Sequence, residues 1–251
     1  MALALLQPRF LRNKVQMYVA PLTLIRATNS LQIVLHYNSN AQAAKHSVEK
    51  LRGLGVKAIA VQADATSTNF GEQLVKSTLE AFPGRNIDII VNNAAHVFFG
   101  EGVQASSVEE FDKAFHANVR GPMLLLQAAY PHLTAPGARL IHVGTVVARS
   151  GTKYANLYSA SKGALNALTA SWSEELSEKG ITVNTVAPGP IGTGMAPPEE
   201  HDLVQKFRTI QHIKRNGTPE EVAEVIAFVA GPRSSFITGQ VIGVDGGMSY
   251  V

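Results

Sequence analysis

Tyr158 and Lys162 are the strongest candidates for catalytic residues in the sequence. They stand four positions apart in a segment with helical character, so both side chains project from one helical face. A cation about one turn from a phenol favours the phenolate and lowers the phenol's pKa, which is near 10 in water. Thr145 supplies a hydroxyl where the predicted strand at 139–144 ends. These three groups suit general acid–base catalysis, although a lone Tyr and Lys at this spacing are more often ordinary surface residues.

The composition is typical of a globular protein that acts on small molecules. Of the 251 residues, 45% are hydrophobic and 16% are charged. The sequence has no cysteine, which excludes disulfides and thiolate zinc sites, and its 8 histidines are scattered, so we expect no metal site. A net charge of +3 without a Lys/Arg run argues against nucleic acid, and no stretch is long enough to span a membrane. We expect a cytoplasmic protein that binds neither nucleic acid nor membrane.

Strand and helix patterns alternate along the chain. Apolar runs predict strands at 15–20, 31–37, 57–64, 87–95, 139–144, 181–189 and 240–247. Helical patterns lie between them, at 40–52, 70–82, 107–132, 154–179 and 218–230. Strands that are apolar on both faces indicate a parallel sheet covered by helices on both sides. We therefore predict a single α/β domain over residues 1–251, doubly wound, with a sheet of about seven strands. Ligands bind such sheets beyond the carboxyl ends of the strands.

Two helix starts carry the pattern of a capping box. Ser107 is followed by Glu110, and Thr218 by Glu221, so each hydroxyl and carboxylate is expected to satisfy the other residue's backbone amide. The stretch after residue 189 is rich in proline and glycine, which predicts a loop before the helix at 218–230.

Residues 31–251 resemble the short-chain dehydrogenase/reductase family, especially its β-ketoacyl-carrier-protein reductases and fungal polyketide ketoreductases. The resemblance rests on separated motifs in the family's order: Asp64 after a strand, NNAA at 92–95, Asn118, YSASK at 158–162, APGPIGT at 187–193 and the terminal GQVIGVDGG. It implies a Rossmann-like fold and an NADP(H)-dependent oxidoreductase that reduces a ketone, or oxidises the alcohol, on a small apolar or polyketide-like substrate. It also implies a homotetramer packed through the helices at 107–132 and 154–179.

The resemblance assigns catalytic roles to four residues. Tyr158 would protonate the carbonyl oxygen as hydride reaches its carbon. Lys162 would lower that tyrosine's pKa and hold the nicotinamide ribose, and Asn118 would help to hold a water that relays protons to Lys162. Thr145 stands where the family usually has serine. Its hydroxyl still donates a hydrogen bond, and its methyl group is expected to narrow the pocket.

Five further positions resemble the family's cofactor contacts. Asp64 would meet the adenine, Asn93 the adenosine ribose, and Ile191 and Thr193 the carboxamide and phosphate end. Arg120 is either a basic cofactor contact or a solvated charge on a helix. The loop at 96–99, which follows NNAA, either lines the substrate cleft or packs on a helix.

The end of the predicted strand at 31–37 bears on the choice of cofactor. An acidic residue there binds the ribose 2′-hydroxyl of NAD and repels a 2′-phosphate. The chain has His36, Tyr37, Asn38 and Ser39 at this place and no acid. These polar residues favour NADP(H).

The first unit of the fold departs from the family pattern. The family's first strand leads into a glycine-rich turn that brings backbone amides close to a pyrophosphate, but this chain has no glycine before Gly53. Residues 25–27 resemble the helix start after that turn, with Pro21 and Leu22 where the phosphates belong. Residues 21–30 are too few for a glycine turn and a full crossover helix. Three explanations stay open: a misassigned start or splice junction, weak cofactor binding, or a cofactor-free, non-catalytic partner protein on the same fold.

Overall fold

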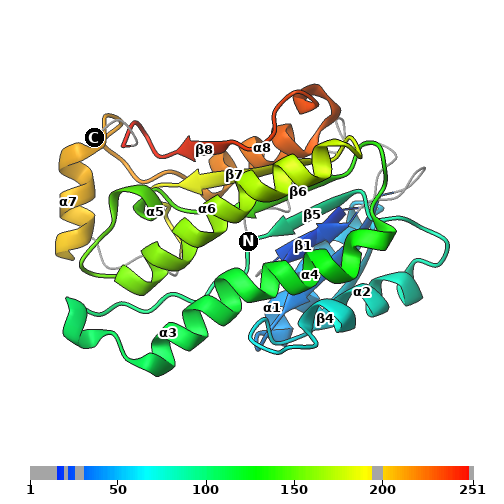
Figure 1. Cartoon of the computed structure of the whole chain (residues 1–251), viewed down its shortest axis with the longest axis horizontal. Helices are drawn as coiled ribbons and strands as arrows, with labels where there is room; N and C mark the ends of the chain where they lie inside the picture. Colours follow the sequence, from blue (N-terminus) through cyan, green and yellow to red (C-terminus); the bar gives the residue numbers. More distant parts are fainter. Residues whose placement is uncertain (1–15, 20–21, 26–30, 194–199, 249–251) are drawn as a thin grey trace.

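A computed structural model of the chain describes residues 16–19, 22–25, 31–193 and 200–248, with only the backbone for the first two ranges. Its centre is an eight-stranded sheet (Figure 1). The strands are β1 (Gln16–Val19), β2 (Leu22–Ile25), β3 (Gln32–Tyr37), β4 (Lys57–Gln62), β5 (Ile89–Asn92), β6 (Arg139–Val143), β7 (Thr182–Pro188) and β8 (Val241–Val244).

Seven of the strands run parallel in the order β4-β3-β1-β5-β6-β7-β8. The chain order reverses between β1 and β5, which is the switch point of a doubly wound sheet. All carboxyl ends of these strands therefore lie along one edge. The predicted doubly wound α/β fold is confirmed.

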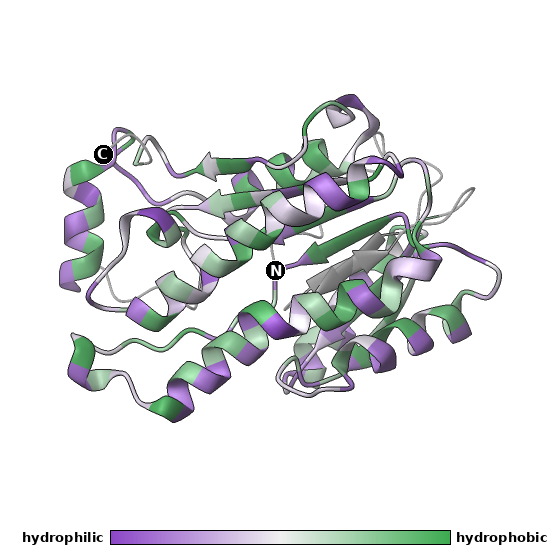
Figure 2. Cartoon of the chain, viewed as in Figure 1, coloured by the Kyte–Doolittle hydropathy of each residue, from purple (hydrophilic) through white to green (hydrophobic). Residues whose placement is uncertain are grey.

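Helices cover both faces of the sheet because successive strand residues point to opposite sides. The main helices are α1 (Ala41–Gly53), α2 (Phe70–Ala81), α3 (Val108–Phe115), α4 (Gly121–Ala129), α5 (Val147–Ser150), α6 (Asn156–Ser177), α7 (Asp202–Ile210) and α8 (Pro219–Ala230). Val34 belongs to the core cluster that also contains residues of α2, α4 and α6, whereas its neighbours Ile33 and Leu35 belong to the cluster that contains residues of α1. Figure 2 shows mostly hydrophobic residues along β5 to β8 and alternating hydropathy along the helices. No helix in the described ranges has an apolar run long enough to cross a membrane.

The helix predicted over 107–132 is interrupted where Asn118 lies. A π-helix at His116–Arg120 separates α3 from α4, and the amide of Gly121 donates to the carbonyl of His116, five residues back. Pro122 follows and has no N–H to offer the carbonyl of Asn118, so a regular α-helical ladder cannot continue there. Single π turns often occur at functional sites because they redirect one side chain. Here the interruption turns Asn118 into the protein interior, where it is 0% exposed.

The two predicted capping boxes differ in outcome. Thr218 and Glu221 form the complete reciprocal box at the start of α8. At α3, the Ser107 hydroxyl accepts from the Glu110 amide at 3.1 Å, but the Glu110 carboxylate bonds His96 and Lys113 instead of closing the box. Only the serine half of the predicted box at Ser107 forms. The prediction for Glu110 is wrong, because its carboxylate makes tertiary contacts in place of the bond to the helix start.

The first unit contains a hairpin where a βαβ unit is usual. β2 runs back along β1 in antiparallel pairs, from Val19–Leu22 to Gln16–Ile25. Ile25, predicted at the start of a helix, instead ends β2; Pro21 and residues 26–27 lie outside the described residues. The prediction that this unit is atypical is confirmed.

The packing of α2 against α4 can be tested at Gly71. A Cβ atom there would overlap the backbone carbonyl of Leu124 on α4, which has no rotamer by which to escape. We expect Gly71→Ala to lower the free energy of unfolding by about 1–3 kcal/mol. Gly53→Ala, where a Cβ meets nothing within 4 Å at the end of α1, should leave it unchanged or raise it by up to ~1 kcal/mol. Urea denaturation measures both, and equal effects would contradict the close helix contact.

Candidate active site

A cavity of about 310 Å³ opens at the carboxyl edge of the sheet, and Thr145, Tyr158 and Lys162 all line it. Tyr158 and Lys162 reach it from successive turns of α6, and Thr145 reaches it from the segment between β6 and α5. The remaining wall is largely apolar. The cavity therefore combines proton-transfer groups with a surface suited to a nonpolar molecule.

Lys162 is the most buried of these groups, with 1% of its surface exposed. Its ammonium Nζ donates to the backbone carbonyl of Val143, the last residue of β6, at 2.7 Å. Burial disfavours the charged form and lowers the pKa of Lys162 to about 8. The contact with Val143 fixes the long side chain against the end of the strand.

Tyr158 differs from the sequence prediction in its protonation. Burial raises its pKa to about 12, where the prediction had Lys162 lowering it. Nζ of Lys162 lies 5.9 Å from the centroid of the Tyr158 ring and is directed to Val143. Desolvation of the phenolate thus outweighs the attraction of the cation. At neutral pH, Tyr158 is a neutral phenol that can donate a proton.

Thr145 is held in place by the start of α5. Its Oγ1 accepts from the backbone amide of Val147 at 3.4 Å, and both residues line the cavity. The Thr145 O–H proton is free to point to a ligand oxygen, since this contact uses the oxygen only as an acceptor.

Asn118 joins the loop after β5 to α6. Its Oδ1 accepts from the amide of His96 at 2.7 Å, and its Nδ2 donates to the carbonyl of His96 at 2.8 Å and to Oγ of Ser161 at 2.9 Å. Ser161 in turn donates to the carbonyl of Tyr158 at 2.9 Å. Asn118 therefore connects the loop to the turn that carries Tyr158, and its predicted water-holding role stays a prediction.

The predicted cofactor residues fall into two groups. Asn93, Ile191 and Thr193 line the same cavity as Tyr158. Asp64 and Arg120 do not line it. Thr66, which follows β4, bridges the two residues. Its amide and its hydroxyl each donate a hydrogen bond to the Asp64 carboxylate at 2.8 Å, and its carbonyl accepts one from Arg120.

Arg120 is thus more than a solvated helix charge. It is partly buried, and its Nε is shielded from solvent with no hydrogen-bond partner. The guanidinium fastens the π-helix to the turn that contains Asp64.

Several residues of the cavity wall were missed by the sequence analysis. α7 lies within the predicted loop, and its Leu203, Val204 and Phe207 line the cavity. Their spacing, with Ile210 one turn further, is helical and was the available signal. In the loop after NNAA, Val97 and Phe99 line the cavity and His96 and Phe98 do not. The His96 ring instead contacts Glu110 of α3.

The polar groups of the cavity fit the nicotinamide and ribose half of a dinucleotide. They comprise an ammonium, hydroxyls and the side-chain amides of Asn93 and Asn216, and Oδ1 of Asn216 is buried without a hydrogen-bond partner. Such a donor and acceptor set suits ribose hydroxyls and a carboxamide. The pyrophosphate end fits less well, because β1 is followed by β2 in the described chain and not by a helix N-terminus. Among the described residues, no group of three His, Asp or Glu side chains is arranged to hold a metal ion.

The doubly wound sheet, with a Tyr–Lys pair in a cavity at its carboxyl edge, defines an α/β protein with a nucleotide-type ligand site. A family model described as Enoyl-(Acyl carrier protein) reductase matches residues 26–249, beginning after β2. The chain is 32% identical to the short-chain dehydrogenase/reductase FrzI of Cladobotryum sp, covering 90% of this chain and 89% of that protein. The chain belongs to the short-chain dehydrogenase/reductase family, as the sequence motifs predicted.

Two further relatives are similar over most of their length. Versicolorin reductase 1 of Aspergillus parasiticus is 31% identical, over 86% of each chain. The crystal structure of the angucycline C-6 ketoreductase LanV with bound NADP is 27% identical, with a TM-score of 0.81 over 88% of this chain and 87% of that one.

The ionisation of Tyr158 can be measured directly in the protein alone. The ultraviolet difference spectrum between the wild type and Tyr158→Phe reports the phenolate of this one tyrosine. We expect it to stay flat through pH 10, where a free tyrosine is half-ionised, because burial disfavours the anion. A phenolate signal with a midpoint near pH 7 would contradict this account and restore the sequence prediction.

Proposed function

We propose that the protein is an NADPH-dependent reductase of a ketone on an apolar, polyketide-like small molecule, working in secondary metabolism. The observation that carries the proposal is the joining of Tyr158, Lys162 and Thr145 in one largely apolar cavity. The names of two relatives, a versicolorin reductase and an angucycline ketoreductase, support the reaction and the substrate class. NADP bound in the latter structure supports the cofactor.

In the proposed carbonyl reduction, Tyr158, Thr145 and Lys162 each have a separate role. Bound NADPH would supply the hydride to the carbonyl carbon. Tyr158 donates its phenolic proton to the developing alkoxide, for which a neutral phenol is the required form. Thr145 donates a hydrogen bond to the same oxygen and orients it. Lys162, charged below a pKa of about 8, stabilises the tyrosinate left after proton transfer.

Other residues would hold the cofactor and the substrate. Lys162 and Asn93 would bind ribose hydroxyls, and the segment from Ile191 to Thr193 would meet the carboxamide and phosphate end. Asp64 and Arg120 would hold the adenosine half at the end of β4. β3 ends without an acid, which favours the 2′-phosphate of NADPH over the free hydroxyl of NADH.

The wall beyond these groups would receive the apolar part of the substrate. Val97 and Phe99 form it on the side of the loop after β5, and Leu203 and Phe207 form it on α7. A cavity of about 310 Å³ lies within the range for small-molecule sites.

A second candidate function is a non-catalytic partner protein on the same fold. The observation that favours it is the β1–β2 hairpin, which stands where a pyrophosphate-binding helix start is expected. A protein of this kind would have no need for cofactor affinity. A dehydratase or epimerase with the same Tyr and Lys is a further alternative. We also propose a homotetramer, on the family resemblance alone, and a cytoplasmic location, on the composition of the sequence.

Replacement of Tyr158 tests the proposed chemistry. With NADPH and 2-tetralone, a two-ring ketone, we expect Tyr158→Phe to lower kcat by roughly 10²–10⁴-fold, because the variant has no proton to donate. Tyr154→Phe is the matched control: its hydroxyl lies 3.4 Å from Asp202 and outside the cavity wall, so turnover should stay within about twofold. A Tyr158→Phe enzyme that keeps most of its turnover would overturn the assignment.

A further inference from the structure

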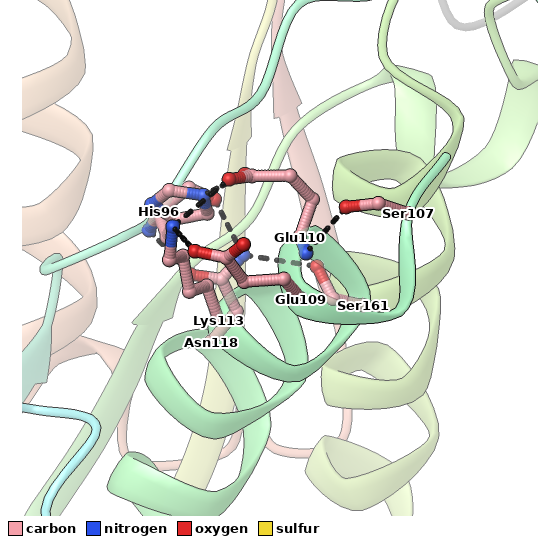
Figure 3. A network of polar contacts seen from close by, with 7 residues as sticks. All are labelled: His96, Ser107, Glu109, Glu110, Lys113, Asn118 and Ser161. Atoms are coloured by element: carbon pink, nitrogen blue, oxygen red, sulfur yellow. Dashed lines mark hydrogen bonds and ion pairs between the residues drawn. The ribbon is translucent and has the colours of Figure 1, made fainter. Parts of the chain in front are cut away.

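A cluster of charged side chains lies beside the catalytic network, on the outer side of the loop that follows β5 (Figure 3). Nε2 of His96 lies 2.8 Å from Oε2 of Glu110, at the start of α3. The other carboxylate oxygen of Glu110 accepts from Lys113 at 3.1 Å, and Lys113 also pairs with Glu109 at 2.7 Å. The cluster thus connects the active-site loop to α3.

His96 is held from two sides. Asn118 bonds both its backbone amide and its backbone carbonyl, and Glu110 bonds its ring. The Glu110 side chain is 18% exposed, so the contact is largely shielded from water. Hydrogen bonds to a carboxylate are stronger than neutral ones, and shielding from solvent strengthens them further.

The helix start of α3 shows that this contact competes successfully with a local one. Ser107 and Glu110 have the same pattern as Thr218 and Glu221. The Glu221 carboxylate accepts a hydrogen bond from the Thr218 amide at 2.8 Å, which completes the capping box of α8. Glu110 instead turns to His96. The start of α3 therefore lacks the hydrogen bond from the Ser107 amide to Glu110, and the Glu110 carboxylate bonds the loop at His96 in its place.

The carboxylate of Glu110 stays charged over the working range of pH. A hydrogen bond from His96, followed in size by one from Lys113, lowers the pKa of Glu110 below its ordinary value. The group is therefore a permanent acceptor for the imidazole N–H of His96.

The loop beyond His96 forms part of the cavity wall. Val97 and Phe99 line the cavity directly after His96. The next fixed points are the amides of Gly100 and Gly102, which donate to the carbonyls of Tyr154 and Lys153 at 3.0 Å. The short segment at 97–99 is thus held between His96 on one side and Gly100 on the other.

We propose that Glu110 is a positioning residue which, through His96, sets the places of Val97 and Phe99 in the cavity wall and thereby selects ketones by the size of their apolar part. The proposal rests on the proposed function of the same cavity. Glu110 does not line the cavity. Two of the groups that perform the reduction are held by contacts outside this loop, Lys162 by the carbonyl of Val143 and Thr145 by the amide of Val147. The loss of Glu110 should therefore affect recognition of the substrate far more than the rate of the chemical step.

Steady-state kinetics with two ketones test this proposal. For Glu110→Ala we expect KM for 2-tetralone to rise roughly tenfold, the effect of losing one charged hydrogen bond, with kcat within about twofold. KM for cyclohexanone, which is too small to need that wall, should change little. Glu110→Gln, whose amide oxygen still accepts from His96, should restore most of the selectivity. Glu109→Ala removes a carboxylate from the same helix and the same lysine, and should leave both KM values unchanged.

Hydrogen exchange gives a readout that does not need turnover. The amides of His96, Gly100 and Gly102 should exchange faster in Glu110→Ala than in the wild type or in Glu109→Ala. Unchanged exchange, or faster exchange with an unchanged KM ratio for the two ketones, would overturn the proposal. A fall in kcat equal for both ketones would do so as well. If the wild type reduces neither ketone with NADPH, the proposed function fails, and the exchange rates alone decide whether Glu110 holds the loop.

Discussion

The burial of the Lys162 ammonium at the carboxyl edge of the sheet is the constraint on which the rest of the site depends. A charge that is 1% exposed needs a fixed polar partner, and the carbonyl that ends β6 provides it at 2.7 Å. This contact fixes the rotation of α6 and therefore the direction of Tyr158, one turn earlier. The same burial lowers the pKa of the lysine and raises that of the tyrosine. At neutral pH, Tyr158 is therefore a neutral phenol, and Lys162 is a cation whose pKa of about 8 lies not far above that pH.

A second set of contacts relates this helix to the rest of the cavity. Through Ser161, the π-helix at His116–Arg120 links the backbone of Tyr158 to the loop after β5. Glu110 holds the same loop from its outer side. The catalytic turn and the apolar wall are thus parts of one hydrogen-bonded unit. Such fixed positioning of a proton donor and a substrate contributes strongly to catalysis because little is left to reorganise during the reaction.

Features encoded by neighbouring residues were predictable from the sequence. The parallel sheet follows from its apolar runs, and the helix of Tyr158 and Lys162 follows from its periodicity. Properties that depend on distant parts of the chain were not. The pKa of Tyr158 depends on how much of the fold covers it, and the partner of Glu110 lies in another segment. α7 was missed because nearby prolines and glycines concealed a short helical pattern around Leu203 and Phe207.

The fold departs most from the family pattern where the cofactor's phosphates would bind. There, β1 pairs with the antiparallel strand β2 and is not followed by the usual glycine-rich turn and helix. Calorimetric titration of this chain with NADPH measures whether the remaining contacts hold the cofactor. We expect saturable binding with a Kd between about 1 μM and 1 mM, weaker binding of NADH, and a clear loss of affinity in Lys162→Met. No binding of NADPH at millimolar concentration would overturn the proposed reductase and favour a non-catalytic partner protein on the same fold.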